Sequence, residues 1–274
     1  MLEETIKNAN MTILVSEEDY QVDGLWYCGK CHTKKQGEYN ILGQVVRPMI
    51  LCKCAAEELA RDEARIAEDE KRKAIIRMRE VGFPDRKMTE WTFDADDGSN
   101  PKLTQAMRNY VDNFDRFKKD GKGLILYGSV GTGKTFASAQ VANALIDKGI
   151  PALVTSISRV VNTIQGMYEG KQEYIDSLNR YDLVVLDDLG TERSTEYMQE
   201  QVFNIIDSRY RSGLPMIITS NLTMDRIKNP EGIVNQRIYD RVLERCFPIE
   251  VSGASRRRKI VRDSYEGMKE IIYG

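Results

Sequence analysis

The chain has 274 residues, of which 30% are charged and 41% hydrophobic, and its formal net charge at pH 7 is -2. This length can bury a substantial core and predicts one main domain with a smaller appended one, while the small net charge excludes a uniformly basic nucleic-acid coat. The acidic N-terminal segment and the lack of an apolar run of membrane-spanning length predict a cytoplasmic protein with no membrane partner.

The first distinctive feature in chain order is a group of cysteines that follows the turn signal Asp23-Gly24. Two close cysteine pairs can each supply two thiolates to one metal ion from a tight turn, which completes a tetrahedral site. The spacing therefore predicts structural zinc with all four ligand positions filled, by Cys28, Cys31, Cys52 and Cys54. Free or redox-active thiols are the alternative, and His32, the only histidine, is an alternative to one of the thiolates.

Residues 55–80 contain neither proline nor glycine and are dense in Ala, Glu, Arg and Lys, which predicts one long helix. Its apolar residues are sparse and do not sustain a heptad pattern, so a charged connecting helix is favoured over a coiled coil. The sequence Gly82-Phe83-Pro84 ends the helix, because glycine commonly caps helices and proline disfavours helix in the residue before it. We therefore expect a zinc-binding module with its linker helix at residues 1–80 and a second domain at 81–274.

The second domain contains a glycine-rich segment between an apolar run at 124–127 and a helix-like run at 136–142. Glycines let such a loop curl so that its backbone N–H groups point at phosphate oxygens, and the next helix adds its positive N-terminal end. Lys134 is expected to reach the β- and γ-phosphates of ATP, and Thr135 to hold Mg²⁺. All fixed positions of the P-loop pattern match, which disfavours a chance glycine turn: Gly128, Ser129, Val130, Gly131, Thr132, Gly133, Lys134 and Thr135.

Strand-like and helix-like segments alternate around this loop. Such alternation predicts an α/β fold, a doubly wound parallel sheet flanked by helices. The expected strands are 124–127, 149–155, 183–188, 214–221 and 248–251, and the expected helices are 102–118, 136–142, 157–178 (as one or two) and one around 236–242.

Polar side chains follow two of the expected strands. Asp187 and Asp188 end an apolar run, and active sites of parallel sheets lie at the carboxyl ends of strands. Asp187 is thus expected to bind Mg²⁺ through water, and Asp188 to orient the attacking water. Asn221 ends the next strand, where it either reaches the γ-phosphate or the attacking water, as a sensor residue, or simply closes the strand as a turn residue.

Arginines at the C-terminal end of the domain are candidates for phosphate contacts. Arg237 and Arg241 are four residues apart and share one face of the expected helix. One of them could be a solvated, salt-bridging residue, and the other could reach a neighbouring subunit's γ-phosphate as an arginine finger. The cationic run at 256–259 can bind the phosphates of a nucleotide or of nucleic acid, although short basic runs are usually just solvated.

The order of these motifs resembles that of the AAA+ ATPases, specifically the DnaC/DnaI-type replicative helicase loaders of bacteria and their phages. The resemblance covers roughly residues 83–260, and the cysteine module with its charged helix looks like the helicase-binding region of these loaders. It implies a Walker A motif at 128–135, Walker B at Asp187 and Asp188, and sensor 1 at Asn221. It further implies an arginine finger at Arg241, with Arg237 as the alternate, and a sensor 2 arginine at Arg257.

The expected function is accordingly that of an ATPase that binds a DnaB-type replicative helicase and helps to place it on single-stranded DNA, with self-association through the arginine finger. An IstB-like transposition ATPase, which acts with a transposase on duplex DNA, is the closest alternative. A small-molecule P-loop kinase is the third hypothesis, with the arginine pair acting within one chain. The four-cysteine module favours the loader.

Overall fold

The computed structural model describes residues 15–190, 195–255, 265, 268–269 and 271–273. The chain divides into two compact units, Met1–Arg72 and Lys73–Gly274. The helix α2 (Lys53–Gly82) begins in the first unit and ends in the second, and it contains the whole of the helix expected at 55–80. None of the helices in the described ranges combines the length and the apolar character needed to cross a bilayer.

The first unit contains two small antiparallel hairpins. Strands β1 (Tyr20–Val22) and β2 (Leu25–Tyr27) form one hairpin, and strands β3 (Tyr39–Ile41) and β4 (Gln44–Val46) form the other. The expected turn between the first two strands is present, with Asp23 and Gly24 both at positive φ. Among the described residues of this unit, Cys28 and Cys52 are two of the few buried apolar side chains, so these residues provide little hydrophobic core to hold the hairpins.

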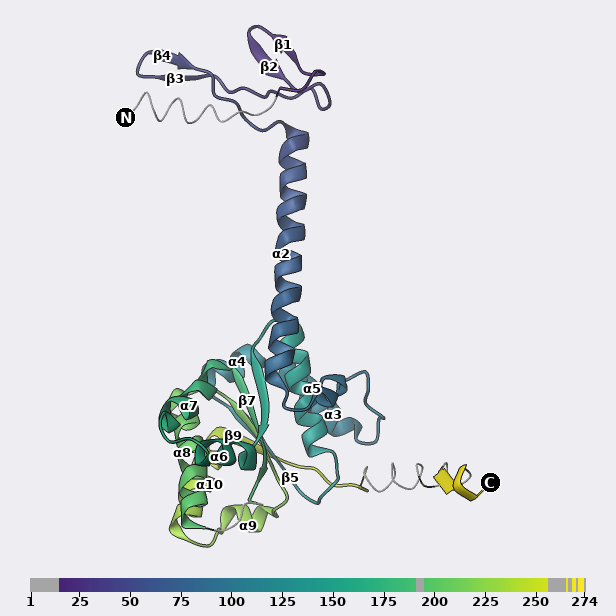
Figure 1. The fold of residues 1–274 in the computed structure, drawn as a ribbon, viewed down its shortest axis with the longest axis vertical. Helices are drawn as coiled ribbons and strands as arrows, with labels where there is room; N and C mark the ends of the chain where they lie inside the picture. Colours follow the sequence, from purple (N-terminus) through teal and green to yellow (C-terminus); the bar gives the residue numbers. More distant parts are fainter. Residues whose placement is uncertain (1–14, 191–194, 256–264, 266–267, 270, 274) are drawn as a thin grey trace. The chain divides into compact units, whose positions relative to one another are not determined.

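The second unit is an α/β layer structure around a five-stranded parallel sheet of order β6-β7-β8-β5-β9 (Figure 1). The strands are β5 (Gly123–Tyr127), β6 (Ala152–Ser156), β7 (Leu183–Leu189), β8 (Met216–Ser220) and β9 (Cys246–Glu250). The short helices are η1 (Arg86–Glu90), α4 (Phe114–Asp120), α7 (Lys171–Ser177), η2 (Leu178–Arg180) and α9 (Met224–Lys228). The longer helices are α3 (Pro101–Asp112), α5 (Lys134–Asp147), α6 (Ile157–Gln165), α8 (Glu196–Ser212) and α10 (Ile233–Arg245).

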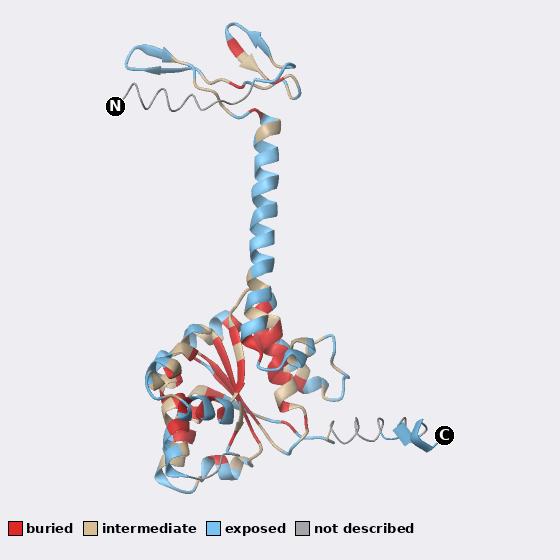
Figure 2. Ribbon diagram, in the orientation of Figure 1, coloured by how far each residue is buried: buried red, intermediate tan, exposed pale blue. Residues whose placement is uncertain are grey.

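Helices cover both faces of this sheet, and the central strands are buried on both sides (Figure 2). Leu124 and Leu126 of β5 face a core that α3 and α5 complete, whereas Ile125 faces a second core built with α6, α8 and α10. Burial on both faces explains why these strands are continuous apolar runs in the sequence. The predicted doubly wound parallel sheet is confirmed.

One predicted helix is wrong in its extent. The segment expected as a single helix at 102–118 is split at Asn113 into α3 and α4. The Asn113 side chain and its backbone N–H both donate to the carbonyl of Asn109, which caps α3 instead of continuing it. The break lets Phe114 and Phe117 pack around Tyr110, with ring centroids 6.0 and 4.8 Å from the tyrosine ring.

The edge strand β9 begins earlier than expected, at Cys246, and contains Pro248. Proline cannot donate to a sheet, but β9 is an edge strand that pairs on one side with β5, and no strand of the described ranges pairs with its other side. After β9 the backbone N–H of Val251 donates to Tyr127 O at 2.8 Å. The chain that follows β9 is thereby held beside the end of the P-loop strand.

Candidate nucleotide site and cysteine cluster

The glycine-rich segment forms the connection between β5 and α5. Gly128, Gly131 and Gly133 have φ angles of 134°, 83° and 98°, a region that favours glycine. A Cβ atom on Gly128 would lie 2.6 Å from Val251 O, and one on Gly131 would lie 2.3 Å from Ser255 Oγ. The loop therefore needs glycine both for its backbone conformation and for its close contact with the segment after β9.

Lys134 is the first residue of α5, and its side chain is folded against the loop. Its residue surface is only 5% exposed, and its Nζ donates to the carbonyls of Gly128 at 2.9 Å and Ser129 at 2.7 Å. Thr132 Oγ1 also donates to Ser129 O, at 2.9 Å. A cation held inside a curled loop at a helix N-terminus is suited to bind phosphate oxygens, since both the ammonium and the free N–H groups of the helix attract anions.

Asp187 lies at the centre of a cluster of hydroxyl groups. Its Oδ1 accepts hydrogen bonds from Thr135 Oγ1 at 2.8 Å and from Thr219 Oγ1 at 2.6 Å. Burial raises the pKa of Asp187 above the ordinary value of an aspartate, and the two threonine donors act in the opposite direction. Carboxylate and hydroxyl oxygens are hard ligands, so this set of donors fits Mg²⁺.

The neighbouring Asp188 is placed by an irregularity in the sheet. Between the paired positions Leu186 and Leu189 the register of β7 against β8 shifts, so that Asp187 and Asp188 together oppose a single residue, Thr219. Asp188 has a φ of 61°, which an aspartate tolerates better than most residues. Its backbone N–H donates to Thr219 Oγ1 at 2.9 Å, and its Oδ1 accepts from Asn221 Nδ2 at 3.1 Å.

The structure thus brings together most of the predicted site residues at the carboxyl ends of β5, β7 and β8. Thr219 was not predicted, although it contacts both aspartates. Two polar residues, Thr219 and Ser220, end a strand that is otherwise apolar and is buried throughout, and they are the signal in the sequence that points to it. The register of the parallel strands, in which Leu126 pairs with Thr219 and Tyr127 with Ser220, sets its depth in the site.

The two arginine candidates lie on the other side of the sheet. Arg237 and Arg241 belong to α10, which packs on the face opposite to α5. Arg241 Nε forms an ion pair with Asp207 Oδ1 at 2.7 Å. Among the described residues, neither arginine forms a hydrogen bond or an ion pair with the Asp187 cluster of its own chain. Arg257 lies outside the described residues.

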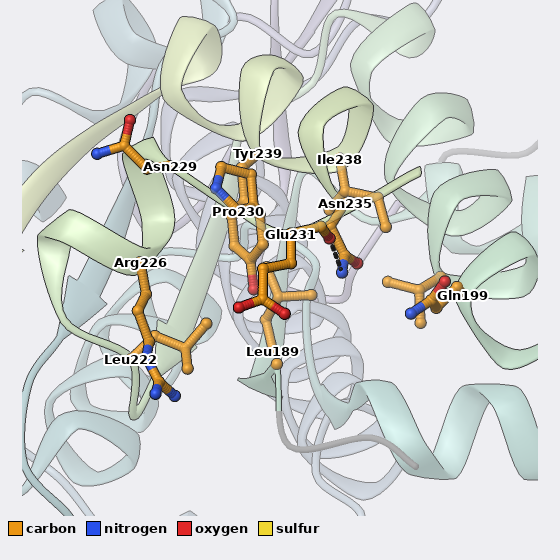
Figure 3. Close-up of a pocket in the computed structure, with 12 residues that line it drawn as sticks. Leu189, Gln199, Leu222, Arg226, Asn229, Pro230, Glu231, Asn235, Ile238 and Tyr239 are labelled. Carbon is orange, nitrogen blue, oxygen red and sulfur yellow. Dashed lines mark hydrogen bonds between the residues drawn. The ribbon is translucent and has the colours of Figure 1, made fainter. Parts of the chain in front are cut away.

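A separate cavity of about 330 Å³ lies beside the Walker B strand, where α8, α9 and α10 meet (Figure 3). Gly190 and Leu222 line it, and they follow Asp188 and Asn221 closely in the chain. Two of the residues that line the cavity are joined by a hydrogen bond, which Asn235 Nδ2 donates to Glu231 O at 2.9 Å. Its lining residues within the described ranges include none of the P-loop.

The four N-terminal cysteines converge in the first unit. Their sulfur atoms all lie within 4.8 Å of one another, with Cys28 Sγ 3.5 Å and Cys52 Sγ 3.4 Å from Cys54 Sγ. A tetrahedral zinc site with Zn–S bonds of about 2.3 Å has sulfur atoms roughly 3.8 Å apart, so the four thiols fit zinc. Hydrogen bonds, chiefly from the Thr33 hydroxyl 3.1 Å from Cys31 Sγ, lower the pKa of Cys31 to about 5, whereas the neighbouring thiols raise the pKa of Cys54.

His32 is not a member of this group. Its Nδ1 lies 3.2 Å from the Tyr20 hydroxyl, and its φ of 56° places it in the tight turn after Cys31. The alternative in which the histidine replaces one thiolate is therefore not supported by the described geometry, whereas the thiol cluster is compatible with a zinc site.

The sequence of the chain is similar to a protein family and to several known proteins. A profile of the family described as "IstB-like ATP binding protein" matches residues 50–264. The replicative helicase loader DnaI of Bacillus subtilis is 27% identical over 176 residues, which cover 60% of this chain and 56% of DnaI. An ATP-binding protein of an insertion sequence in Mycobacterium tuberculosis is 27% identical over 203 residues, 71% of this chain and 78% of that protein. The match to DnaI thus spans little more than half of that relative's length.

Two solved structures share the fold of the second unit. The crystal structure of DnaI is 25% identical with a TM-score of 0.52, and the match covers 61% of this chain and 94% of that one. The crystal structure of the DnaC helicase loader is 22% identical with a TM-score of 0.53, and the match covers 61% of this chain and 100% of that one. The predicted AAA+ type of P-loop sheet is thereby confirmed.

The Walker residues generate the first prediction. Lys134→Ala should abolish ATP binding. Asp188→Asn should lower turnover by at least about 100-fold with little change in ATP affinity, which is the size of effect expected when an electrostatic interaction with the transition state is lost. Nucleotide titration and steady-state phosphate release measure the two effects. Lys148→Ala, which removes an exposed cation after the other end of α5, is the control and should behave as the wild type. Near-normal rates in both site variants would refute the assigned roles.

The buried carboxylate of Asp187 generates a second prediction, on stability. A folded-state pKa above the unfolded value means that stability is lost as pH rises through the window between the two. Asp187→Asn keeps an oxygen that accepts from Thr135 and Thr219 and removes this cost. At pH 7 the nucleotide-free variant should melt roughly 2–4 °C higher, a shift that about 1 kcal/mol produces in a domain of this size.

The difference in melting temperature between the variant and the wild type should shrink as pH falls toward the ordinary pKa of an aspartate. The side chain at position 187 is then neutral in both proteins. Magnesium-dependent ATP turnover by the same variant should be lost. A variant that melts below the wild type at neutral pH would show that the carboxylate stabilises the empty site.

The cysteine cluster generates a third prediction. Purified under reducing conditions without chelator, the protein should carry about one zinc ion per chain, and Cys28→Ser with Cys31→Ser should lose it. Nucleotide binding should persist, because the P-loop sheet has its own core. Cys246→Ala, at the fifth cysteine, buried in the second unit, is the matched control and should retain zinc. Metal-free wild-type protein would contradict a zinc site.

Proposed function

This chain belongs to the family of IstB-like ATP-binding proteins, and we propose that within it the protein is an ATP-dependent loader of a DnaB-type replicative helicase. The ATP-binding AAA+ domain is common to loaders and insertion-sequence ATPases, so it does not choose between them. The observation that carries the proposal is the four-cysteine cluster at the start of the charged helix α2. The similarity to DnaI, which is a replicative helicase loader, supports it.

Within one subunit the P-loop side chains bind and orient ATP. Lys134 would exchange its contacts with the loop carbonyls for phosphate oxygens, and Thr135 and Asp187 would hold Mg²⁺, which would supply charge neutralisation at the phosphates. Asp188 accepts a hydrogen bond from the attacking water, and the Asn221 amide fixes the orientation of the Asp188 carboxylate by donating to its Oδ1. Thr219 supports both aspartates and is the additional residue that the geometry contributes to this set.

Hydrolysis is further proposed to need arginine contacts to the phosphates, in addition to Lys134. Arg241, with Arg237 as the alternate, acts in a neighbouring subunit's site, and Arg257 contacts nucleotide as the sensor 2 residue. This role agrees with the position of α10 on the sheet face opposite to α5, away from its own P-loop helix. Self-association of the AAA+ domain is therefore part of the proposal.

The N-terminal module, residues 1–80, is proposed to grip the helicase, with residues 81–274 as the ATP-driven switch. The module has a cysteine cluster suited to bind a metal ion that would hold its small hairpins. Single-stranded DNA is proposed to bind weakly and in a salt-dependent manner, through local cationic patches of the second domain, because the net charge of the chain is only -2.

Action with a transposase is the second candidate function. The match to the ATP-binding protein of a Mycobacterium tuberculosis insertion sequence covers a larger share of both chains than the match to DnaI, which favours this alternative. The two functions differ in partner and in DNA substrate. Preferred binding to duplex over single-stranded DNA, without capture of a helicase, would support the transposition function instead.

A capture experiment with full-length protein tests the proposal. A DnaB-type helicase should be retained by the wild type and by Lys134→Ala, because the grip does not depend on nucleotide. The Cys28→Ser, Cys31→Ser variant should lose at least about tenfold in affinity while it still binds ATP. Lys134→Ala should retain the helicase yet fail to place it on single-stranded DNA.

Cys246→Ala controls for the loss of a thiol outside the cluster and should bind the helicase as the wild type does. If the double cysteine variant binds the helicase with unchanged affinity, the assignment of the grip to the N-terminal module is wrong. If no variant and no wild-type protein binds a helicase, the loader function itself is wrong.

A further inference from the structure

The guanidinium of Arg241 is held in a defined orientation by residues of the neighbouring helix α8. Arg237, Arg241 and Arg245 recur every fourth residue on one face of α10, and Phe203 and Tyr210 are presented to them from α8. The Arg241 guanidinium carbon lies 4.7 Å from the ring centroid of Phe203 and 5.6 Å from that of Tyr210. The aromatic rings thus restrict the guanidinium plane, since cations favour positions over the ring faces.

Asp207 fixes the same group along one edge. Its Oδ1 accepts from Arg241 Nε at 2.7 Å, and its Oδ2 accepts from Arg211 Nε at 2.8 Å. The Asp207 side chain is 12% exposed, that of Arg241 is 25% exposed and that of Arg211 is 77% exposed. The Asp207 carboxylate is therefore a nearly buried anchor for Arg241, whereas Arg211 lies in solvent.

The remaining nitrogens of Arg241 differ in their contacts. Nη1 donates to the carbonyl of Arg237 at 3.2 Å, and Nη2 has no hydrogen-bond partner among the described residues. A planar guanidinium that is bound through Nε and Nη1 keeps the direction of its Nη2 hydrogens fixed. Within the part of the chain that the structure describes, these hydrogens remain available to an acceptor such as an anion from a second subunit.

We propose that Asp207 is a positioning residue for hydrolysis in the neighbouring subunit: it holds Arg241 by Nε so that Nη2 faces the γ-phosphate of a nucleotide bound to a second copy of this chain. The inference rests on the proposed role of Arg241 between subunits. Without Asp207 the Arg241 guanidinium can rotate. It then spends a smaller fraction of time in the orientation that stabilises charge in the transition state.

The anchor requires arginine. A lysine at position 241 has a single nitrogen, which can pair with Asp207 or with a phosphate but not with both in the fixed geometry that a guanidinium allows. Charge alone is therefore insufficient at this position. Arg241→Lys should lose as much turnover as Arg241→Ala, although it preserves the ion pair with Asp207.

Asp207→Asn, which keeps the shape of the side chain, tests the proposal in the full chain. We expect kcat for ATP to fall about tenfold or more, with KM and the affinity for a fluorescent ATP analogue within twofold of wild type, because α8 lies on the sheet face opposite to α5. Arg211→Ala removes the other ion pair of the same carboxylate and is the matched control, with turnover within twofold of wild type.

Subunit mixing separates positioning from a general structural defect. An Asp207→Asn subunit has an intact P-loop, and a Lys134→Ala subunit has an intact Arg241 with its anchor, so mixtures should regain turnover above the sum of the two proteins. Equal recovery for Arg241→Ala mixed with Lys134→Ala is the positive control. A defect confined to the subunit's own site or to its folding would not recover.

The outcomes distinguish this inference from the function on which it rests. If Arg241→Ala is inactive and recovers on mixing while Asp207→Asn turns over normally, the anchor is refuted and the role of Arg241 stands. If Arg241→Ala turns over normally, the role between subunits is refuted, and the inference with it. Should Asp207→Asn not fold, Arg241→Lys decides: wild-type turnover of that variant would overturn the proposal.

Discussion

The hydrogen bonds of Thr135 and Thr219 to a single oxygen of Asp187 are the contacts on which the second unit's site depends. They connect three segments that are far apart in the chain: the start of α5, the end of β7 and the end of β8. They form only because the strands are parallel and end at the same edge, with β8 between the P-loop strand and the Walker B strand. The sheet therefore positions the side chains of the site, because it fixes where the strands end.

The same sheet separates two kinds of chemistry. Nucleotide-binding groups lie toward α5 on one face, and the arginines of α10 pack against α8 on the other. In this arrangement the layer that contains α5 carries the nucleotide-binding groups, and the layer of α8 and α10 carries the Arg241 guanidinium in a fixed orientation. Under the role proposed for Arg241, each nucleotide site is completed by a neighbouring subunit.

Much of this architecture could be predicted from the sequence, because motif and burial patterns are local. The P-loop, the Asp187-Asp188 pair and the apolar strands follow from residue types at short spacing. The role of Thr219 depends on the strand register, and the pairing of Arg241 with Asp207 depends on how α8 packs against α10. Those contacts join residues more than 30 positions apart, which sequence periodicity does not predict. The break at Asn113 has a different cause, since it arises from a side chain that caps its own helix.

A titration of ATP binding to Thr135→Val, with magnesium and with EDTA, tests the central role of the Thr135 and Asp187 contact most directly. Valine has nearly the shape of threonine but no hydroxyl to bind a metal ion. The affinity for ATP in EDTA should match that of the wild type within about twofold, and the gain in affinity that magnesium gives to the wild type should be largely lost. An unchanged gain with magnesium would contradict a metal site built from Thr135 and Asp187.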